Sequence, residues 1–111
     1  DAQYKIASQS TFDWVLGKNP TGYSFVTGFG DKRAMHIHHR PSEGDEIEYP
    51  QPGWVVGGPN PGNKYDCGEE AYTSPYPARA YVDMLCSYAT NEIAINWNAP
   101  FVYVAFGLQA D

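Results

Sequence analysis

The chain has 111 residues, enough for one small domain and too few for two. Its formal net charge of −6 argues against nucleic acid or an anionic membrane as a partner, since both reward a basic patch. The sequence contains 9 Tyr, 5 Phe and 3 Trp beside 11 Gly and 9 Pro. We therefore expect aromatic surface for a core or for ligand stacking, in a chain that is largely loop and turn.

A helix is predicted over residues 2–16. Phe12, Val15 and Leu16 lie on one face of this helix, and a stripe of smaller or polar residues continues the face toward its start. Gly17 suits the left-handed position that follows a helix, and Pro20 stands where a helix cannot easily continue. The helix is therefore expected to end just before Gly17.

Between Asn19 and about Pro77, glycine and proline recur so often that neither a helical nor a strand period survives. Such a long structureless stretch is normally functional, so it either lines a site or packs against polypeptide outside these residues. Residues 55–60 (VVGGPN) predict a turn. The two cysteines, Cys67 and Cys86, either form a disulfide or stay free, and two are too few to indicate the compartment.

Two elements are predicted in the C-terminal third. Residues 78–88 fit a short helix or a buried irregular turn. For residues 99–108, a helix capped by Asn98, with Pro100 in its first turn, competes with a strand favoured by β-branched and aromatic residues. This segment is apolar nearly all round, which predicts burial on every side by more polypeptide than the chain supplies.

Glu92 is the one carboxylate in residues 90–99 (TNEIAINWNA). Its neighbours are apolar or amide residues, and no lysine or arginine occurs from Met84 to Asp111. Such surroundings disfavour the charged form of a carboxylic acid and suit it to proton donation. The alternative is a solvated glutamate near a helix start, where carboxylates are common.

A run of histidines, residues 35–40 (MHIHHR), forms the first candidate site. In an extended segment, alternation would point His36, His38 and Arg40 to one side, as the polar wall of a ligand cleft. A zinc site that combines these histidines with Cys67 or Cys86 is one alternative. Surface histidines in a loop are another.

The second candidate site is the pattern Tyr81-x-Asp83-x4-Tyr88-x3-Glu92. Carboxylates among aromatic side chains suit carbohydrate chemistry, because acids act on the glycosidic oxygen while rings stack on sugar faces. The alternative is that Asp83 is a structural hydrogen-bond acceptor and Glu92 an ordinary loop residue.

These patterns resemble the signatures of glycoside hydrolase family 9, the endoglucanases. Residues 24–40 resemble the family's first signature, and residues 81–99 are similar to its second. Residues 16–20 (LGKNP) and 56–60 (VGGPN) resemble two further landmarks. The resemblance covers essentially the whole chain and implies an all-α fold, an (α/α)6 barrel. Residues 1–111 would then be the C-terminal portion of one catalytic domain, its last helices and long active-site loops, incomplete by themselves.

The resemblance also implies an activity: a secreted endo-β-1,4-glucanase (cellulase) that cleaves β-1,4-glucan with inversion. Glu92 matches the general acid, while His38 and Arg40 match the active-site histidine and arginine beside the cleaved sugar. Asp83 matches the signature aspartate, which we expect to orient site groups rather than to act on the bond. We therefore predict a catalytic group of Glu92, Asp83 and His38. Four further residues are predicted to bind substrate: Arg40, His36, Tyr88 and Trp97.

The family's catalytic base is an aspartate in a short D-x-x-D stretch. No such stretch occurs here, because residues 42–45 (SEGD) lack the first aspartate. The resemblance therefore implies that the base lies in an N-terminal remainder of the domain, which would be this chain's partner. Without that partner the chain is expected to be inactive.

No cofactor is expected to be required. Calcium is often bound in the family, and Asp66, Glu69 and Glu70 could supply oxygen ligands for a structural Ca²⁺. A non-catalytic carbohydrate-binding module stays open as an alternative function, although such a module should show short alternating strands at regular spacing.

Overall fold

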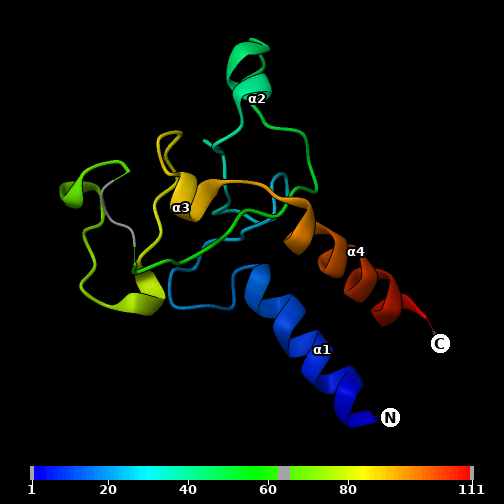
Figure 1. The fold of residues 1–111 in the computed structure, drawn as a ribbon. Helices are drawn as coiled ribbons and strands as arrows, with labels where there is room; N and C mark the ends of the chain where they lie inside the picture. The colour runs from blue at the N-terminus through cyan, green and yellow to red at the C-terminus, as the bar shows by residue number, and fades with distance from the viewer. Residues whose placement is uncertain (1, 63–65, 111) are drawn as a thin grey trace.

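The computed structural model describes residues 2–62 and 66–110. Its helices are α1 (Ala2–Val15), α2 (Arg40–Gly44), α3 (Tyr88–Asn91) and α4 (Ile95–Gln109), joined by irregular chain that includes the 3₁₀ turns η1 (Glu69–Ala71) and η2 (Pro77–Arg79) (Figure 1). Over these described ranges β-pairing is limited to isolated bridges. None of the described helices is long and apolar enough to cross a bilayer.

The N-terminal helix is confirmed by α1. It ends at Val15, and Gly17 has a φ of 118°, a backbone conformation that side chains with a Cβ rarely adopt. Asn19 then closes the turn, because its Nδ2 donates to the carbonyls of Trp14 at 2.7 Å and Tyr23 at 2.8 Å. The turn directs the chain into the buried part of the molecule.

Short extended segments in the middle of the chain pair into a closed circuit. Its bridges are Ser24 with Arg33, Val26 with Val55, Val56 with Ile93, and Glu92 with His38. Residues 33 and 38 belong to one continuous stretch, so the last bridge leads back to the first. We call residues 24–26, 33–38, 55–56 and 92–93 the bridge circuit.

The turn predicted over residues 55–60 is wrong. Val55 and Val56 each form a bridge. Gly57 and Gly58 then donate their N–H groups to the carbonyls of Glu92 at 3.1 Å and Thr90 at 2.8 Å. The two glycines thus extend the pairing with the stretch around Glu92 instead of reversing the chain.

The hydrophobic core lies within this irregular region and not between the helices. The Phe25 ring meets Trp14 of α1 with centroids 5.4 Å apart and Tyr81 with centroids 4.9 Å apart. The buried members of the core cluster are Phe25, Ala34, Ile37, Val56 and Tyr81. The long loop is therefore ordered by burying its own apolar side chains.

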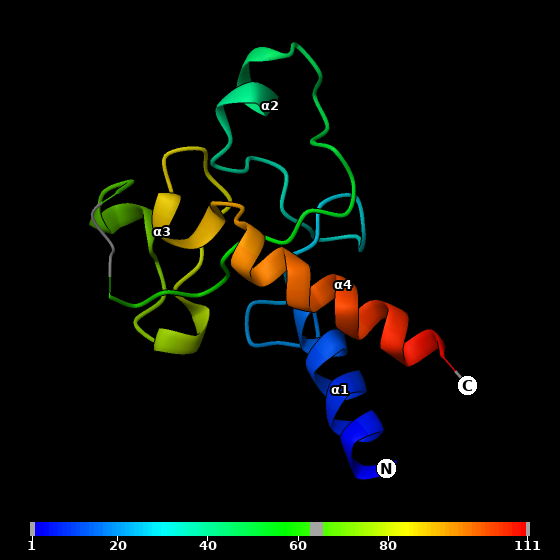
Figure 2. The same ribbon diagram turned by 45° about the vertical axis from the view of Figure 1, so that its right-hand side comes forward.

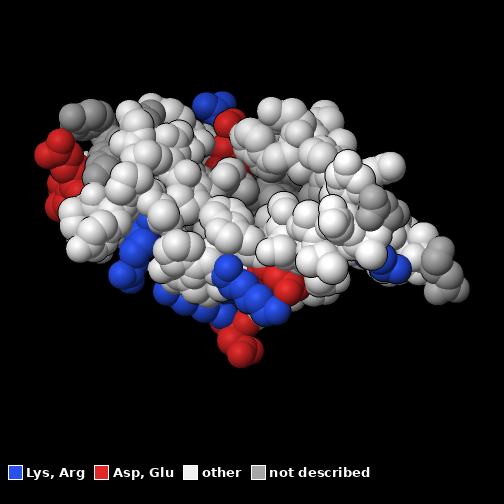
Figure 3. All heavy atoms as spheres, turned by 90° about the horizontal axis from the view of Figure 1, so that it is seen from below, with Lys and Arg blue, Asp and Glu red and all other residues white. Residues whose placement is uncertain are grey.

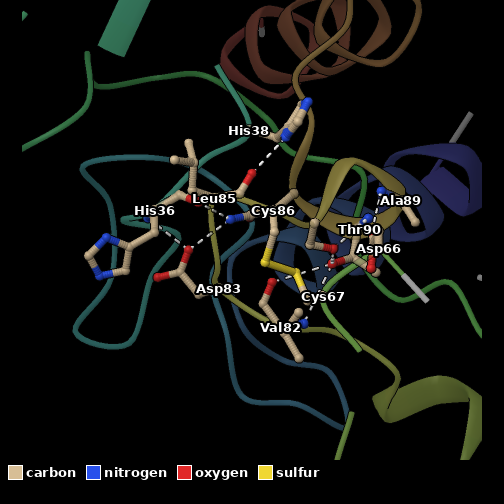
Figure 4. The surroundings of a disulfide bond; sticks show 12 residues. His36, His38, Asp66, Cys67, Val82, Asp83, Leu85, Cys86, Ala89 and Thr90 are labelled. Atoms are coloured by element: carbon tan, nitrogen blue, oxygen red, sulfur yellow. Dashed lines mark hydrogen bonds between the residues drawn. A yellow bond between two sulfur atoms is a disulfide. The ribbon is translucent and has the colours of Figure 1, made fainter. Parts of the chain in front are cut away.

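Residues 80–87 are irregular, between η2 and α3, so the irregular alternative is found, although Met84, Cys86 and Tyr88 are exposed rather than buried. A disulfide joins Cys67 to Cys86 (Figure 4), so neither thiol is available to the zinc site considered above. Beside it, the Asp66 carboxylate accepts hydrogen bonds from Tyr72 Oη at 2.6 Å and from the N–H of Ala89 at 2.9 Å. The bond from Ala89 attaches Asp66 to the first turn of α3.

The last predicted element is a helix and not a strand. α4 begins at Ile95, so its N-cap is Ala94 and the prediction that Asn98 caps it is wrong. Asn98 lies inside the helix, where its Oδ1 accepts from the N–H of Val55 and its Nδ2 donates to the Val55 carbonyl, both at 2.9 Å. This pair of hydrogen bonds fastens α4 to the bridge circuit.

α1 and α4 lie side by side and antiparallel, with both termini at one end (Figures 1 and 2). The rings of Phe12 and Phe101 stack with centroids 4.9 Å apart. Neither helix contains a buried residue, and Tyr103 and Phe106 are 81% and 69% exposed. Toward the termini, the face in Figure 3 is almost free of charged side chains. The described residues therefore do not supply the cover that the apolar sequence of α4 predicts.

Candidate active site

Glu92 lies at the C-terminal end of α3, between two segments of the bridge circuit. On one side the N–H of His38 donates to the Asn91 carbonyl at 2.8 Å. On the other side the N–H of Gly57 donates to the Glu92 carbonyl at 3.1 Å. The backbone is thus held from both sides while the side chain is exposed. The apolar enclosure expected from the sequence is not formed by the described residues.

An open hollow beside Glu92 brings together several of the predicted site residues. Trp97 is held in its wall, because its Nε1 donates to the Val55 carbonyl at 2.9 Å. The Tyr88 ring meets the His38 ring edge to face, with centroids 6.1 Å apart. The hollow is lined by Gly57, Gly58, Pro59, Asn60, Tyr88, Ala89, Glu92 and Trp97. A carboxylic acid that lines a hollow together with two aromatic side chains is an arrangement suited to sugar chemistry.

The orientation of His38 follows from one hydrogen bond. Its Nδ1 lies 2.6 Å from the Leu85 carbonyl (Figure 4). A carbonyl oxygen only accepts, so Nδ1 carries a proton and donates it. Nε2 is therefore the ring nitrogen left to meet a ligand.

His36 is separated from His38. The chain bends at His36, and Figure 4 shows the two rings pointing to different sides. The strict alternation predicted for this segment does not hold, and His36 lines another hollow together with Glu43 and Leu85. Arg40 is exposed at the start of α2. Sugar contacts by His36 and Arg40 stay predictions.

Asp83 fixes the backbone that precedes His38. Its carboxylate accepts from the N–H of Met35 at 2.9 Å and from the N–H of His36 at 2.9 Å. It also accepts from Nδ2 of Asn91 at 3.0 Å. These contacts agree with an orienting role for Asp83, away from the exposed hollow.

Asn91 was not singled out from the sequence, although it directly precedes Glu92. It is 0% exposed, and its Oδ1 accepts from Tyr81 Oη at 2.7 Å. Burial and the nearby Asp83 charge raise the pKa of Tyr81, so its hydroxyl stays a donor. An amide beside a candidate acid was the only sequence signal, and its partners come from distant segments.

Of the residues suggested for calcium, Asp66 already has hydrogen-bond donors on its carboxylate. Burial favours the neutral form of Asp66, but the hydrogen bonds from Tyr72 and Ala89 outweigh it and lower the pKa of Asp66. Both of its oxygens thus already have donors. Residues 2–62 and 66–110 contain no group of three His, Cys, Asp or Glu arranged to hold a metal. Calcium binding with Glu69 and Glu70 stays a prediction.

Comparison with known proteins identifies the family. The sequence matches the family model of glycosyl hydrolase family 9 over residues 1–105. The chain belongs to this family. It is 47% identical over 107 residues to the xyloglucan-specific endo-beta-1,4-glucanase BoGH9A of Bacteroides ovatus, covering 96% of this chain and 18% of that protein.

Solved structures of family 9 enzymes show the same fold. A thermostable endoglucanase from Alicyclobacillus acidocaldarius has a TM-score of 0.88 at 42% identity, over 96% of this chain and 20% of that one. The structure of AaCel9A in complex with a cellobiose-like isofagomine has a TM-score of 0.81 at 44% identity, over 95% of this chain and 20% of that one.

These findings confirm the resemblance and the fold class, since the family 9 endoglucanases are (α/α)6 barrels. The chain spans about a fifth of the length of the relatives it matches, so it forms part of such a barrel. That it is the C-terminal portion of the catalytic domain stays a prediction.

Proposed function

We propose that the chain is part of an endo-β-1,4-glucanase that hydrolyses β-1,4-glucan such as cellulose with inversion. The observation that carries this proposal is the hollow lined by Glu92, Tyr88 and Trp97, in which the backbone of Glu92 is held from both sides. Two relatives, one a xyloglucan-specific endo-beta-1,4-glucanase and one in complex with a cellobiose-like isofagomine, support a β-glucan substrate.

In this proposal Glu92 is the general acid, which protonates the glycosidic oxygen as the bond to the leaving sugar breaks. Help of this kind is worth about 10²–10⁴ in rate. The rings of Tyr88 and Trp97 offer faces on which sugar rings stack. Nε2 of His38 and the guanidinium of Arg40 hold the sugar by hydrogen bonding and charge, so alanine at either position should lower kcat without abolishing folding, because the loop is not core.

The catalytic base is proposed to lie in an N-terminal remainder of the domain. Two observations support this: the chain spans about a fifth of its relatives, and it has no D-x-x-D stretch. The same polypeptide would cover the exposed apolar side chains of α1 and α4. The isolated chain should therefore bind a hydrophobic dye and leave soluble cellulose intact. A monodisperse monomer that hydrolyses glucan unaided would contradict this.

We further propose that the enzyme acts outside the cell. The Cys67–Cys86 disulfide supports this location, because such bonds persist in oxidising surroundings. Nothing in the structure favours the non-catalytic module, since the described residues form isolated bridges in place of regularly spaced strands.

The stereochemistry of the product tests the proposed reaction. An inverting enzyme places its two carboxyl groups roughly 6.5–9.5 Å apart, which leaves room for a water molecule on the far side of the ring. With the complete catalytic domain, proton NMR of the first product from a β-linked glucan should show the α-anomer. An initial β-anomer would mean retention and would refute the proposal.

A further inference from the structure

A buried amide lies directly behind the proposed acid. Asn91 is 0% exposed, and each polar atom of its side chain has a partner. Oδ1 accepts from Tyr81 Oη at 2.7 Å, while Nδ2 donates to the His36 carbonyl at 2.7 Å and to Asp83 Oδ1 at 3.0 Å. His36 lies far from Asn91 in the sequence, whereas Tyr81 and Asp83 belong to the irregular segment just before α3.

The chemistry of these partners requires an amide at this position. The His36 carbonyl and the Asp83 carboxylate can only accept hydrogen bonds, so the atom between them has to be a donor with two hydrogens. Tyr81 donates, so the opposite atom has to accept. A carboxylate of the same shape would place an acceptor against two acceptors and a second negative charge beside Asp83.

The main chain of Asn91 makes a second attachment to the segment that contains His36 and His38. Its carbonyl accepts from the N–H of His38 at 2.8 Å, while its side chain holds the carbonyl of His36. Its own N–H donates to the Ser87 carbonyl at 2.9 Å within α3. Asn91 thus joins α3 to the histidine segment at two points, and Glu92 is the next residue in the chain.

We propose that Asn91 is a positioning residue that sets the placement of Glu92 relative to His38 and the bound sugar. The inference rests on the proposed function, because it concerns the delivery of the proton by Glu92. Catalytic groups have to be held within about 0.5 Å of their productive geometry. A displacement of about 1 Å can cost 10²-fold in rate. A buried amide that ties both sides of the site together meets this requirement.

The decisive variant is Asn91→Asp in the complete catalytic domain that carries these residues. It keeps the shape and the bond from Tyr81 but replaces the Nδ2 donor with an acceptor. We expect kcat on cello-oligosaccharides to fall roughly 10- to 100-fold, and kcat on a dinitrophenyl cellobioside to fall by no more than about threefold. The activated leaving group needs little help from an acid, so a misplaced acid affects it least.

A pair of buried tyrosines separates positioning from a general loss of stability. Tyr81→Phe removes the hydroxyl that orients the Asn91 amide. Tyr72→Phe removes a hydroxyl of similar burial that contacts Asp66 and Ser87. Tyr81→Phe should lower kcat on cello-oligosaccharides by roughly three- to tenfold, again sparing the activated substrate. Tyr72→Phe should lower the unfolding temperature and leave kcat within about twofold.

The outcomes decide each proposal separately. If Asn91→Asp stays folded and keeps kcat within about twofold, or loses the same factor on both substrates, the positioning role is refuted. If Asn91→Asp does not fold, Tyr81→Phe decides by the same criterion. Glu92→Gln is measured in parallel. If Glu92→Gln also loses the same factor in kcat on both substrates, the assignment of Glu92 as acid fails, and the role of Asn91 fails with it. If Glu92→Gln loses more kcat on cello-oligosaccharides than on the activated substrate, and the Asn91 and Tyr81 variants do not, only the inference about Asn91 is wrong.

Discussion

The helix pair α1–α4 and the bridge circuit differ in how regular structure relates to burial. The helices are the longest regular elements of the chain, yet neither contains a buried residue. The bridge circuit has only isolated bridges and contains most of the buried apolar side chains. Among the described residues, burial of apolar side chains is therefore concentrated in the bridge circuit and not in the helices.

The difference arises from where the backbone hydrogen bonds are made. A helix satisfies its N–H and C=O groups internally, so it persists without burial. A buried irregular segment needs other partners for these groups. Polar side chains supply them here: Thr27 Oγ1 accepts from the N–H of Trp54 at 2.9 Å and donates to the Gln51 carbonyl at 2.6 Å. Asn98 likewise accepts from the N–H of Val55 and donates to its carbonyl, and Asp83 accepts from the N–H groups of Met35 and His36.

One substitution made in both regions should show the largest contrast. Phe25 is 1% exposed in the core cluster, and Phe106 is 69% exposed on α4. Phe25→Ala should lower the free energy of unfolding of the 111-residue chain by about 3–5 kcal/mol, which abolishes cooperative unfolding in a small domain. Phe106→Ala should change it by no more than about 0.5 kcal/mol. Urea unfolding followed by tryptophan fluorescence measures both.

The same pair tests whether other polypeptide covers α4. In the complete catalytic domain, Phe106→Ala should clearly lower the free energy of unfolding, because the proposed remainder of the barrel would bury the ring. Equal effects of the two substitutions in the isolated chain would show that the bridge circuit is not its stable part.

Two glycines should respond to alanine with opposite signs. Gly28 has a φ of 78°, and an added Cβ would lie 2.6 Å from Pro52 Cβ, so Gly28→Ala should destabilise the chain by roughly 1–3 kcal/mol. At Gly107 in α4 nothing lies within 4 Å of an added Cβ. Gly107→Ala should stabilise the helix by roughly 0.5–1 kcal/mol. Thermal unfolding gives the signs, and a stabilised Gly28→Ala would mean that the turn there is not as described.

A smaller contrast is expected between two aspartates at low pH. Hydrogen bonds, first from Lys18, lower the pKa of Asp13, a partly exposed residue of α1. The pKa of Asp66 is also lowered, because hydrogen bonds outweigh its burial. A lowered folded-state pKa stabilises the fold above the usual value of about 3.9, and the gain is lost as pH falls through the lowered pKa.

Replacing each aspartate by asparagine should reveal the difference. Below about pH 4, the free energy of unfolding should fall less steeply in Asp66→Asn than in the parent. Asp13→Asn should show a smaller change, because the Asp13–Lys18 pair is open to solvent and screened by salt. Acid unfolding curves at low and high salt measure this. If Asp66→Asn leaves the unfolding curve below about pH 4 unchanged, this carboxylate does not hold α3.

The sequence predicts features that depend on neighbouring residues. Apolar spacing and Gly17 located α1 and its end, and the two signatures indicated the family and the (α/α)6 barrel. It did not predict pairings between distant segments, such as Val26 with Val55. Asn98 has the local character of a helix cap, but its partner Val55 lies elsewhere in the chain. For the same reason Asn91 was overlooked, because only the fold brings Tyr81, Asp83 and His36 to its amide.

The proposed reaction requires Glu92 to deliver a proton from the hollow that Tyr88 and Trp97 also line. Glu92→Gln in the complete catalytic domain keeps the shape of the side chain and removes the proton, while Glu46→Gln makes the same change at an exposed glutamate that does not line the hollow. The kcat of Glu92→Gln should fall by about 10²–10⁴ on glucan, with most of the loss spared on a nitrophenyl glycoside, and Glu46→Gln should keep parent activity on both. If Glu92→Gln hydrolyses glucan within about twofold of the parent, Glu92 is not the acid.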